Sequence, residues 1–74
     1  MKYIRDDKSI RLIGKKIKQV RLLQKISQSQ LAFESGIRVN QIGRIERGEI
    51  NTGISTLLAI ARALNVPVKE LVDI

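Results

Sequence analysis

Residues 28–47 read QSQLAFESGIRVNQIGRIER, and this stretch decides how the chain folds. Leu31 and Ala32 form an apolar pair, and Gly36 follows where a short helix would end. Glycine readily takes the left-handed conformation that a sharp turn needs. Ile42 and Ile45 then stand three residues apart, the spacing of a second helix with one buried side. The pattern predicts two helices that cross closely at the small Ala32, with the outer side of the second helix exposed.

A pair of this kind is a helix-turn-helix, in which the second helix fits the major groove of DNA. We predict that second helix at about residues 39–47, ended by Gly48. Ser27 is followed three residues later by Gln30, which predicts a capping box at the start of the first helix. The pattern leaves one alternative open, a helical hairpin that packs in the same way but binds no nucleic acid.

Three further helices are predicted around this pair. Apolar residues recur at helical spacing over residues 10–24, with Gly14 among them to allow close packing of another helix. They are Ile10, Ile13, Ile17, Val20 and Leu23. A fourth helix is predicted over residues 54–64, and Pro67 opens a last one over residues 68–72. The fourth buries Leu57, Ile60, Ala61 and Leu64. No strand pattern is present, so we expect an all-α fold of five compactly packed helices.

The chain has 74 residues, which is room for one domain. Residues 1–9 are polar and charged and are predicted to be an N-terminal arm, with the helix-turn-helix domain at 10–74. The longest apolar run, at residues 57–61, has five residues, far below the ~20 needed to span a bilayer, and no secretory signal pattern is present. We therefore expect a cytoplasmic protein that does not enter membranes.

The net charge of +7 lies entirely in the first third of the chain. Residues 1–25 hold nine basic and two acidic side chains, whereas residues 26–74 hold five of each. This distribution favours a polyanionic partner, either nucleic acid or an anionic membrane surface. Membrane binding would need Ile13, Ile17 and Val20 to enter lipid, but the core requires them. Double-stranded DNA is therefore the expected partner.

The composition also argues against catalysis. The chain has no cysteine and no histidine, so it lacks a thiol nucleophile, the usual general base and the commonest metal ligands. It shows no paired carboxylates in a pattern typical of a cleft. We predict that the protein is not an enzyme and uses no metal, cofactor or small-molecule ligand.

Several motifs together resemble the lambda-repressor/Cro-like helix-turn-helix family, also called the XRE family. They are IGKKIKQVR at residues 13–21, ISQSQLAFESGI at 26–37, IGRIERGEI at 42–50 and STLLAIARALNVPVKEL at 55–71. The resemblance implies a compact five-helix lambda-repressor-like DNA-binding domain. It also implies a sequence-specific transcription regulator that binds a palindromic operator as a homodimer. Phage Cro proteins, restriction–modification controllers and antitoxin-type autoregulators all match at this length. The alternative is an antitoxin-type or protein-interaction module whose DNA binding is secondary.

The resemblance assigns roles to individual residues. Base contact is implied for Val39, Asn40, Gly43 and Arg44. The chemistry fits, since Asn pairs with adenine, Arg with guanine and Val with a thymine methyl. DNA backbone contact is implied for Arg21, Ser27, Gln28, Arg38, Gln41 and Arg47. Arg21 and Glu46 match a partly buried structural ion pair, and Val68, Leu71 and Ile74 match the centre of a dimer interface.

Four residues depart from the family pattern. Lys25 stands where Gly often ends the first helix, and a left-handed Lys there would cost about 1 kcal/mol. Arg38 replaces a usual helix cap, Gly43 replaces a common Ser, and Thr52 replaces a frequent Pro. Because Arg38 and Gly43 belong to the expected DNA face, the base preference of relatives does not transfer to this chain.

Overall fold

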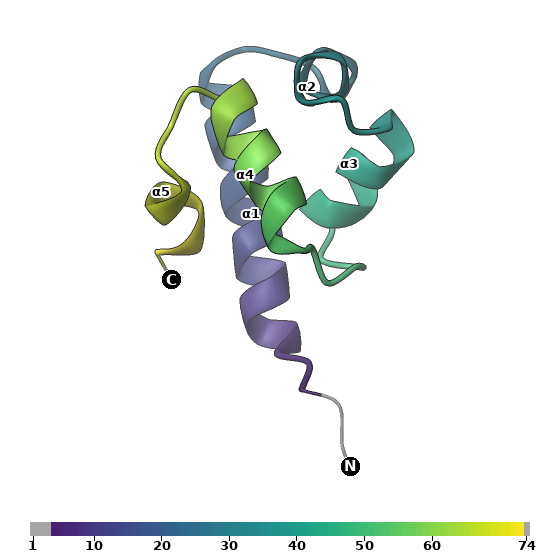
Figure 1. Cartoon of the computed structure of the whole chain (residues 1–74), viewed down its shortest axis with the longest axis vertical. Coiled ribbons are helices and arrows are strands. Elements are labelled where there is room, and N and C mark those ends of the chain that lie inside the picture. The colour runs from purple at the N-terminus through teal and green to yellow at the C-terminus, as the bar shows by residue number, and fades with distance from the viewer. Residues whose placement is uncertain (1–3, 74) are drawn as a thin grey trace.

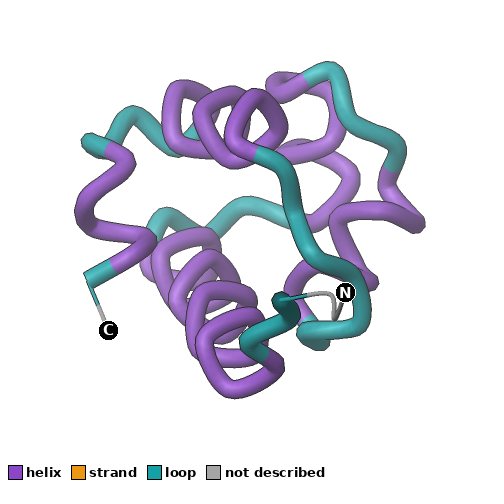
Figure 2. The backbone as a smooth tube through the Cα atoms, turned by 60° about the horizontal axis from the view of Figure 1, so that its bottom comes forward, coloured by secondary structure: helices purple, strands orange, loops and turns teal. Residues whose placement is uncertain are grey.

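A computed structural model describes residues 4–73, which form five helices and no strand (Figure 1). The helices are α1 (Asp7–Leu23), α2 (Gln28–Ser35), α3 (Val39–Glu46), α4 (Ile54–Ala63) and α5 (Val68–Val72). The expected all-α fold is confirmed. Helices α2 and α3 lie on one side of α1 and α5 lies on the other, with α4 packed across the middle (Figure 1). The connections are short loops (Figure 2).

Helix α1 begins at Asp7, three residues before the start that the apolar pattern predicts. The reason is a cap at Asp6, whose Oδ1 accepts a hydrogen bond from the backbone N–H of Ser9 at 3.0 Å. Its Oδ2 also accepts from the Ser9 hydroxyl at 2.6 Å. These bonds lower the pKa of Asp6 below 3.8. Residues 7–9 of the predicted arm are therefore helical, and residues 1–3 lie outside the described part of the chain.

The capping box at the start of α2 forms only in part. The Ser27 hydroxyl accepts a hydrogen bond from the backbone N–H of Gln30 at 3.0 Å, as predicted. The side chain of Gln30 does not reach back to Ser27. Its amide donates to Glu34, one turn further along α2, at 2.9 Å. The Gln30 side chain thus bonds to the charged Glu34 carboxylate at helical i,i+4 spacing. This bond replaces the contact with the Ser27 backbone N–H that a full capping box would make.

Four residues in the left-handed conformation lie just beyond helix ends. Gly36 and Gly48 have φ values of 73° and 72°, and Lys25 and Asn65 have 58° and 56°. Lys25 stands where the family often has Gly, and it adopts the left-handed conformation expected at that position. It costs about 1 kcal/mol of backbone strain relative to glycine. Each of these turns lets the chain reverse within a few residues, so that adjacent helices pack against each other.

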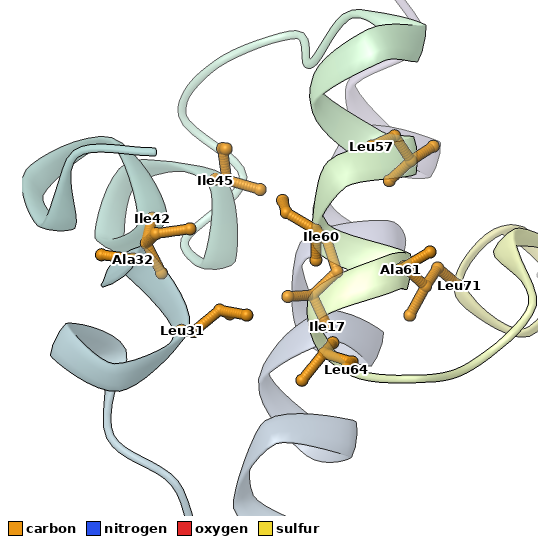
Figure 3. Packing of buried hydrophobic residues seen from close by; sticks show 10 residues of the cluster. All are labelled: Ile17, Leu31, Ala32, Ile42, Ile45, Leu57, Ile60, Ala61, Leu64 and Leu71. Carbon is orange, nitrogen blue, oxygen red and sulfur yellow. The ribbon is translucent and has the colours of Figure 1, made fainter. Parts of the chain in front are cut away.

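The hydrophobic core draws on all five helices (Figure 3). It consists of Ile17, Leu31, Ala32, Ile42, Ile45, Leu57, Ile60, Ala61, Leu64 and Leu71. The predicted burial of the apolar residues of α2, α3 and α4 is confirmed. One residue of α1 differs: Leu23 is 83% exposed and lines an open surface groove beside Val20 and Leu22. It is the last residue of α1, where the chain turns away, so no neighbouring helix covers it.

Gly14 brings α1 and α3 into backbone contact. A Cβ atom on Gly14 would overlap the carbonyl oxygen of Ile45 and lie 2.9 Å from that of Glu46. No side chain fits in this space, which confirms the close packing predicted for Gly14. The contact fixes the C-terminal half of α3 against the longest helix of the protein and so determines which side of α3 faces outward.

Candidate nucleic-acid interface

Helices α2 and α3 form the predicted helix-turn-helix. The turn begins at Gly36, whose N–H donates to the Ala32 carbonyl at 3.0 Å, and the N–H of Ile37 donates to the same oxygen at 3.2 Å. Ala32 is buried where the two helices meet. Ile42 and Ile45 point from α3 into the core (Figure 3). The opposite side of α3 is therefore presented to solvent.

Three of the four predicted base-contact residues lie on this exposed side of α3. Val39 is 45% exposed, Asn40 is exposed, and the Arg44 side chain is 55% exposed. They offer a methyl surface, an amide and a guanidinium along a short helix of eight residues. These are groups that read base edges in the major groove. Arg38 precedes them as the N-cap, and its side chain makes no capping hydrogen bond.

Gly43, the fourth residue predicted to contact bases, is buried in the unbound chain. It is buried under two long side chains, those of Arg47 and Gln28. A Cβ atom on Gly43 would lie 3.0 Å from Nη1 of Arg47 and 3.7 Å from Oε1 of Gln28. The missing side chain thus gives the Arg47 guanidinium room to lie along the helix.

A buried ion pair joins α1 to α3 behind the exposed face. Arg21 donates from Nε to Glu46 Oε2 at 2.7 Å and from Nη2 to Oε1 at 3.0 Å. Its Nη1 donates to the Ile26 carbonyl at 2.9 Å. The Arg21 and Glu46 side chains are 8% and 2% exposed. The hydrogen bonds from Arg21 to Glu46 raise the pKa of Arg21, so its guanidinium stays charged.

This burial bears on the prediction that Arg21 contacts the DNA backbone, which stays a prediction. All three guanidinium nitrogens donate to protein acceptors, and the side chain has little surface left for a phosphate. Arg21 holds α3 against α1 instead. Gln28, also predicted to contact phosphate, is half-buried and donates from Nε2 to Glu46 Oε1 at 3.1 Å. No sequence pattern predicted that Gln28 would be a third donor to the buried carboxylate.

The remaining predicted backbone contacts surround the exposed face. Ser27 and Arg38 are exposed, Gln41 is half-buried, and the Arg47 side chain is 59% exposed. Ser27 and Arg38 immediately precede α2 and α3, and Arg47 follows α3 directly. Ser27, Arg38 and Arg47 are therefore positioned by the start of α2 and by the two ends of α3. Such an edge suits contact with phosphates that flank a groove.

Glu49 is a further residue at this face that the sequence analysis missed. Its Oε1 lies 3.6 Å from Nε of Arg44, and its Oε2 accepts a hydrogen bond from Nε of Arg47. The hydrogen bond from Arg47 is the main cause that lowers the pKa of Glu49. Arg5 donates to the Glu49 backbone carbonyl at 3.3 Å. No local pattern could reveal the carboxylate's role, because Glu49 lies in the loop after α3.

The three residues predicted to centre a dimer interface differ in their exposure. Leu71 is fully buried within a single chain, where it packs α5 onto the core (Figure 3). It is therefore a core residue and has no exposed surface to offer a partner. Val68 is half-buried against the same core, and Ile74 lies outside the described residues. Val72, at the end of α5, is 39% exposed.

Across residues 4–73, none of the helices has the length and apolar character needed to cross a membrane.

The chain is similar to known proteins over most of its length. The helix-turn-helix family model matches residues 17–71. Control protein C.BamHI of Bacillus amyloliquefaciens is 40% identical over 63 residues, covering 84% of this chain and 78% of that protein. Control protein C.SmaI of Serratia marcescens is 38% identical over 60 residues, covering 81% of this chain and 71% of that protein. The crystal structure of the restriction-modification controller protein C.AhdI from Aeromonas hydrophila superposes with a TM-score of 0.85. It is 31% identical, and the match covers 86% of this chain and 97% of that one.

Proposed function

Because this chain belongs to the helix-turn-helix family, we propose that it is a regulator of transcription that reads DNA sequence with α3. DNA-binding regulation is the activity common to the family. The observation that carries the sequence-specific part is the exposed side of α3. There Val39, Asn40 and Arg44 stand free of the core while Gly14 and the Arg21–Glu46 ion pair hold the helix in place. A rigidly held helix with base-reading groups on its outer side is suited to the major groove.

The proposed assembly is a homodimer on a palindromic operator. A single α3 of eight residues reaches few base pairs, and two copies separated by one helical turn of DNA, about 34 Å, would read two half-sites. We propose that the dimer forms at the C-terminal end, around the exposed Val72 and the half-buried Val68. Since a DNA-binding regulator works where the DNA is, we expect the protein in the cytoplasm.

Among the three contexts left open by the sequence, we favour control of a restriction–modification system. Two relatives are named control proteins, and this chain covers 71% and 78% of their lengths. The similar controller structure is covered over 97% of its chain. These relatives therefore support a controller role, in which the level of the protein would regulate transcription directly.

Selection of bound sites from random duplex DNA tests the proposal. We expect the purified protein to select a two-fold symmetric sequence. Arg44→Ala and Asn40→Ala should then each lower operator affinity by about 1–3 kcal/mol and relax the preference at one position in each half-site. Affinity for random DNA should change far less. The difference in affinity between operator and random DNA, which we call the gap, should therefore narrow. Binding titrations on both duplexes measure that gap.

Arg62→Ala is the matched control, because it removes the same charge from an exposed position on α4. It should lower both affinities by similar small factors and leave the gap unchanged. Circular dichroism must first show that each variant folds. Equal losses on operator and random DNA for folded Arg44→Ala and Asn40→Ala would contradict base reading by α3. Sequence preference would then have to come from DNA shape or the N-terminal arm.

A further inference from the structure

An acidic side chain sits among the basic groups of the proposed DNA face. Arg44 lies in the last turn of α3 and Arg47 directly follows the helix, three residues further on. Glu49 places one carboxylate oxygen beside each guanidinium, with Oε1 at 3.6 Å from Arg44 Nε and Oε2 hydrogen-bonded to Arg47 Nε. A surface that only needs to attract a polyanion gains nothing from this negative charge. The carboxylate therefore calls for a separate explanation.

The two contacts share a geometric feature. Both use Nε of the arginine, and within residues 4–73 the Nη1 and Nη2 atoms of Arg44 and Arg47 make no hydrogen bond. Bidentate recognition of guanine needs two adjacent N–H donors of one guanidinium. A carboxylate at Nε restrains the plane of the guanidinium and leaves its terminal nitrogens available. The inner edge of Arg44 thus lies beside the carboxylate as an ion pair at 3.6 Å, longer than a hydrogen bond, and its side chain is 55% exposed.

Glu49 also removes an obstacle to this arrangement. Arg44 and Arg47 are neighbours at i,i+3 spacing, where like charges repel and exposed side chains sample many rotamers. One carboxylate between them offsets the repulsion and reduces the freedom of both. The Glu49 backbone is itself held, since its carbonyl accepts a hydrogen bond from Arg5 at 3.3 Å.

We infer that Glu49 is a positioning residue for sequence reading: its carboxylate bridges Arg44 and Arg47 and orders Arg44 for a bidentate base contact. This role rests on the proposed function, because it assumes that Arg44 contacts a base. Ordering a side chain before binding lowers the entropy lost on binding, and the benefit appears only where the ordered contact is made. The same negative charge repels phosphates on every duplex. Glu49 therefore raises the ratio of operator affinity to random-DNA affinity.

Glu49→Gln tests the inference, because glutamine keeps the shape of the side chain and removes its charge. We expect operator affinity to fall about 2- to 5-fold, the range of an exposed ion pair, while random-DNA affinity rises or stays the same. Glu34→Gln is the matched control, since Glu34 is an exposed carboxylate on α2 whose side chain contacts Gln30. It should shift both affinities by one common factor.

A double variant shows whether Glu49 acts through Arg44. In an Arg44→Ala background, Glu49→Gln should no longer lower the ratio of operator to random-DNA affinity. Relaxation of the arginine Nε–H signals by NMR adds a measurement on the protein without DNA. The signals of Arg44 and Arg47 should report greater mobility in Glu49→Gln than in the unchanged protein.

Two results would overturn the inference while leaving the proposed function intact. In the first, Glu49→Gln raises operator and random-DNA affinity by the same factor, as a purely repulsive charge would. In the second, Arg44 and Arg47 are equally mobile with and without the carboxylate. Failure of the proposed function looks different, because the unchanged protein would then select no preferred sequence. The inference would fall with it, even if NMR showed the bridge to be present.

Discussion

At the residue scale, the protein depends on one buried carboxylate with three donors. Glu46 accepts hydrogen bonds from two nitrogens of Arg21 and from the amide of Gln28. These partners come from α1 and α2, so a single residue of α3 ties together the helices that present the proposed DNA face. Among the described residues, no buried side-chain nitrogen or oxygen lacks a hydrogen-bond partner. Complete pairing of this kind makes a buried charge tolerable.

Removing one member of the pair should be strongly destabilising. Arg21→Met leaves the Glu46 carboxylate buried with only the Gln28 amide, and we expect the free energy of unfolding to fall by about 3–5 kcal/mol. Urea denaturation measures the change. The double variant Arg21→Met/Glu46→Leu should recover much of that loss, because it leaves no unpaired charge. A loss below about 1 kcal/mol for Arg21→Met would mean that solvent reaches the pair in solution.

At the element scale, two glycines inside helices have opposite roles. Gly14 in α1 lies against the backbone of α3, and the space for a Cβ atom is already filled by carbonyl oxygens. Gly43 in α3 lies against the tip of the Arg47 side chain, which is 59% exposed. The backbone of a packed helix cannot yield without separating the helices, whereas a long surface side chain moves easily. Identical residue types therefore carry different constraints.

Alanine substitutions should separate the two roles. Gly43→Ala removes the helix penalty of glycine and displaces only Arg47 Nη1, so we expect α3 to be stabilised by about 1 kcal/mol. Gly14→Ala forces α1 away from α3 and should destabilise the protein by about 1–3 kcal/mol, as overpacking does. Thermal unfolding of both variants gives the comparison. If Gly14→Ala were as stable as Gly43→Ala, the close contact between α1 and α3 would not exist in solution.

At the scale of the whole molecule, the short chain has a small hydrophobic core, so the loss of one core residue should matter for its stability. A domain of this size buries only about 60% of the surface that its unfolded chain exposes. The five-residue α5 contributes Leu71 to that core. The same short helix also carries the exposed apolar residue Val72. The helix thus has to close the core and, in our proposal, supply the dimer surface from its remaining side.

Substitutions in α5 should distinguish these two tasks. Leu71→Ala should cost about 2–5 kcal/mol and largely unfold the domain, because the side chain is fully buried. Val72→Glu should leave a folded chain that sediments as a monomer and binds the operator weakly. Leu23→Glu serves as the control, since it places the same charge on an exposed apolar residue of α1. If Leu23→Glu dissociates the dimer and Val72→Glu does not, the interface lies on α1.

The charge of the molecule leads to a prediction about salt. The excess of +7 arises from residues 1–25, which include α1 and its exposed Arg11, Lys15 and Lys18. If a dimer neutralises roughly 6–10 phosphates, affinity for DNA should fall about 10³- to 10⁵-fold between 50 and 200 mM salt. Fluorescence anisotropy at several salt concentrations measures the slope. A flat dependence would show that the basic first third of the chain does not bind phosphate.

Local sequence patterns predict the five helices and the buried sides of α2, α3 and α4. These features depend on residues within about four positions of one another: the apolar spacing in α3, the Ser27 cap, and the left-handed turns at Gly36 and Lys25. Local rules therefore predict them. The start of α1 also depends on nearby residues, because Asp6 caps the helix through Ser9. The apolar spacing begins only at Ile10, so it predicts a later start. The outer residues of α3 followed from the same spacing.

Other contacts follow from how the helices and loops pack, and no helical or capping pattern in the sequence predicts them. Gln28 donates to Glu46 because α2 and α3 cross there, eighteen positions apart in the chain. Leu71 is buried because α5 folds back onto α1 and α4, and Gly43 is covered because Arg47 and Gln28 lie over it. Glu49 meets Arg44 and Arg47 because the loop after α3 turns back beside the helix. A residue's type and its local spacing do not specify such partners, since each contact depends on the packing of whole helices.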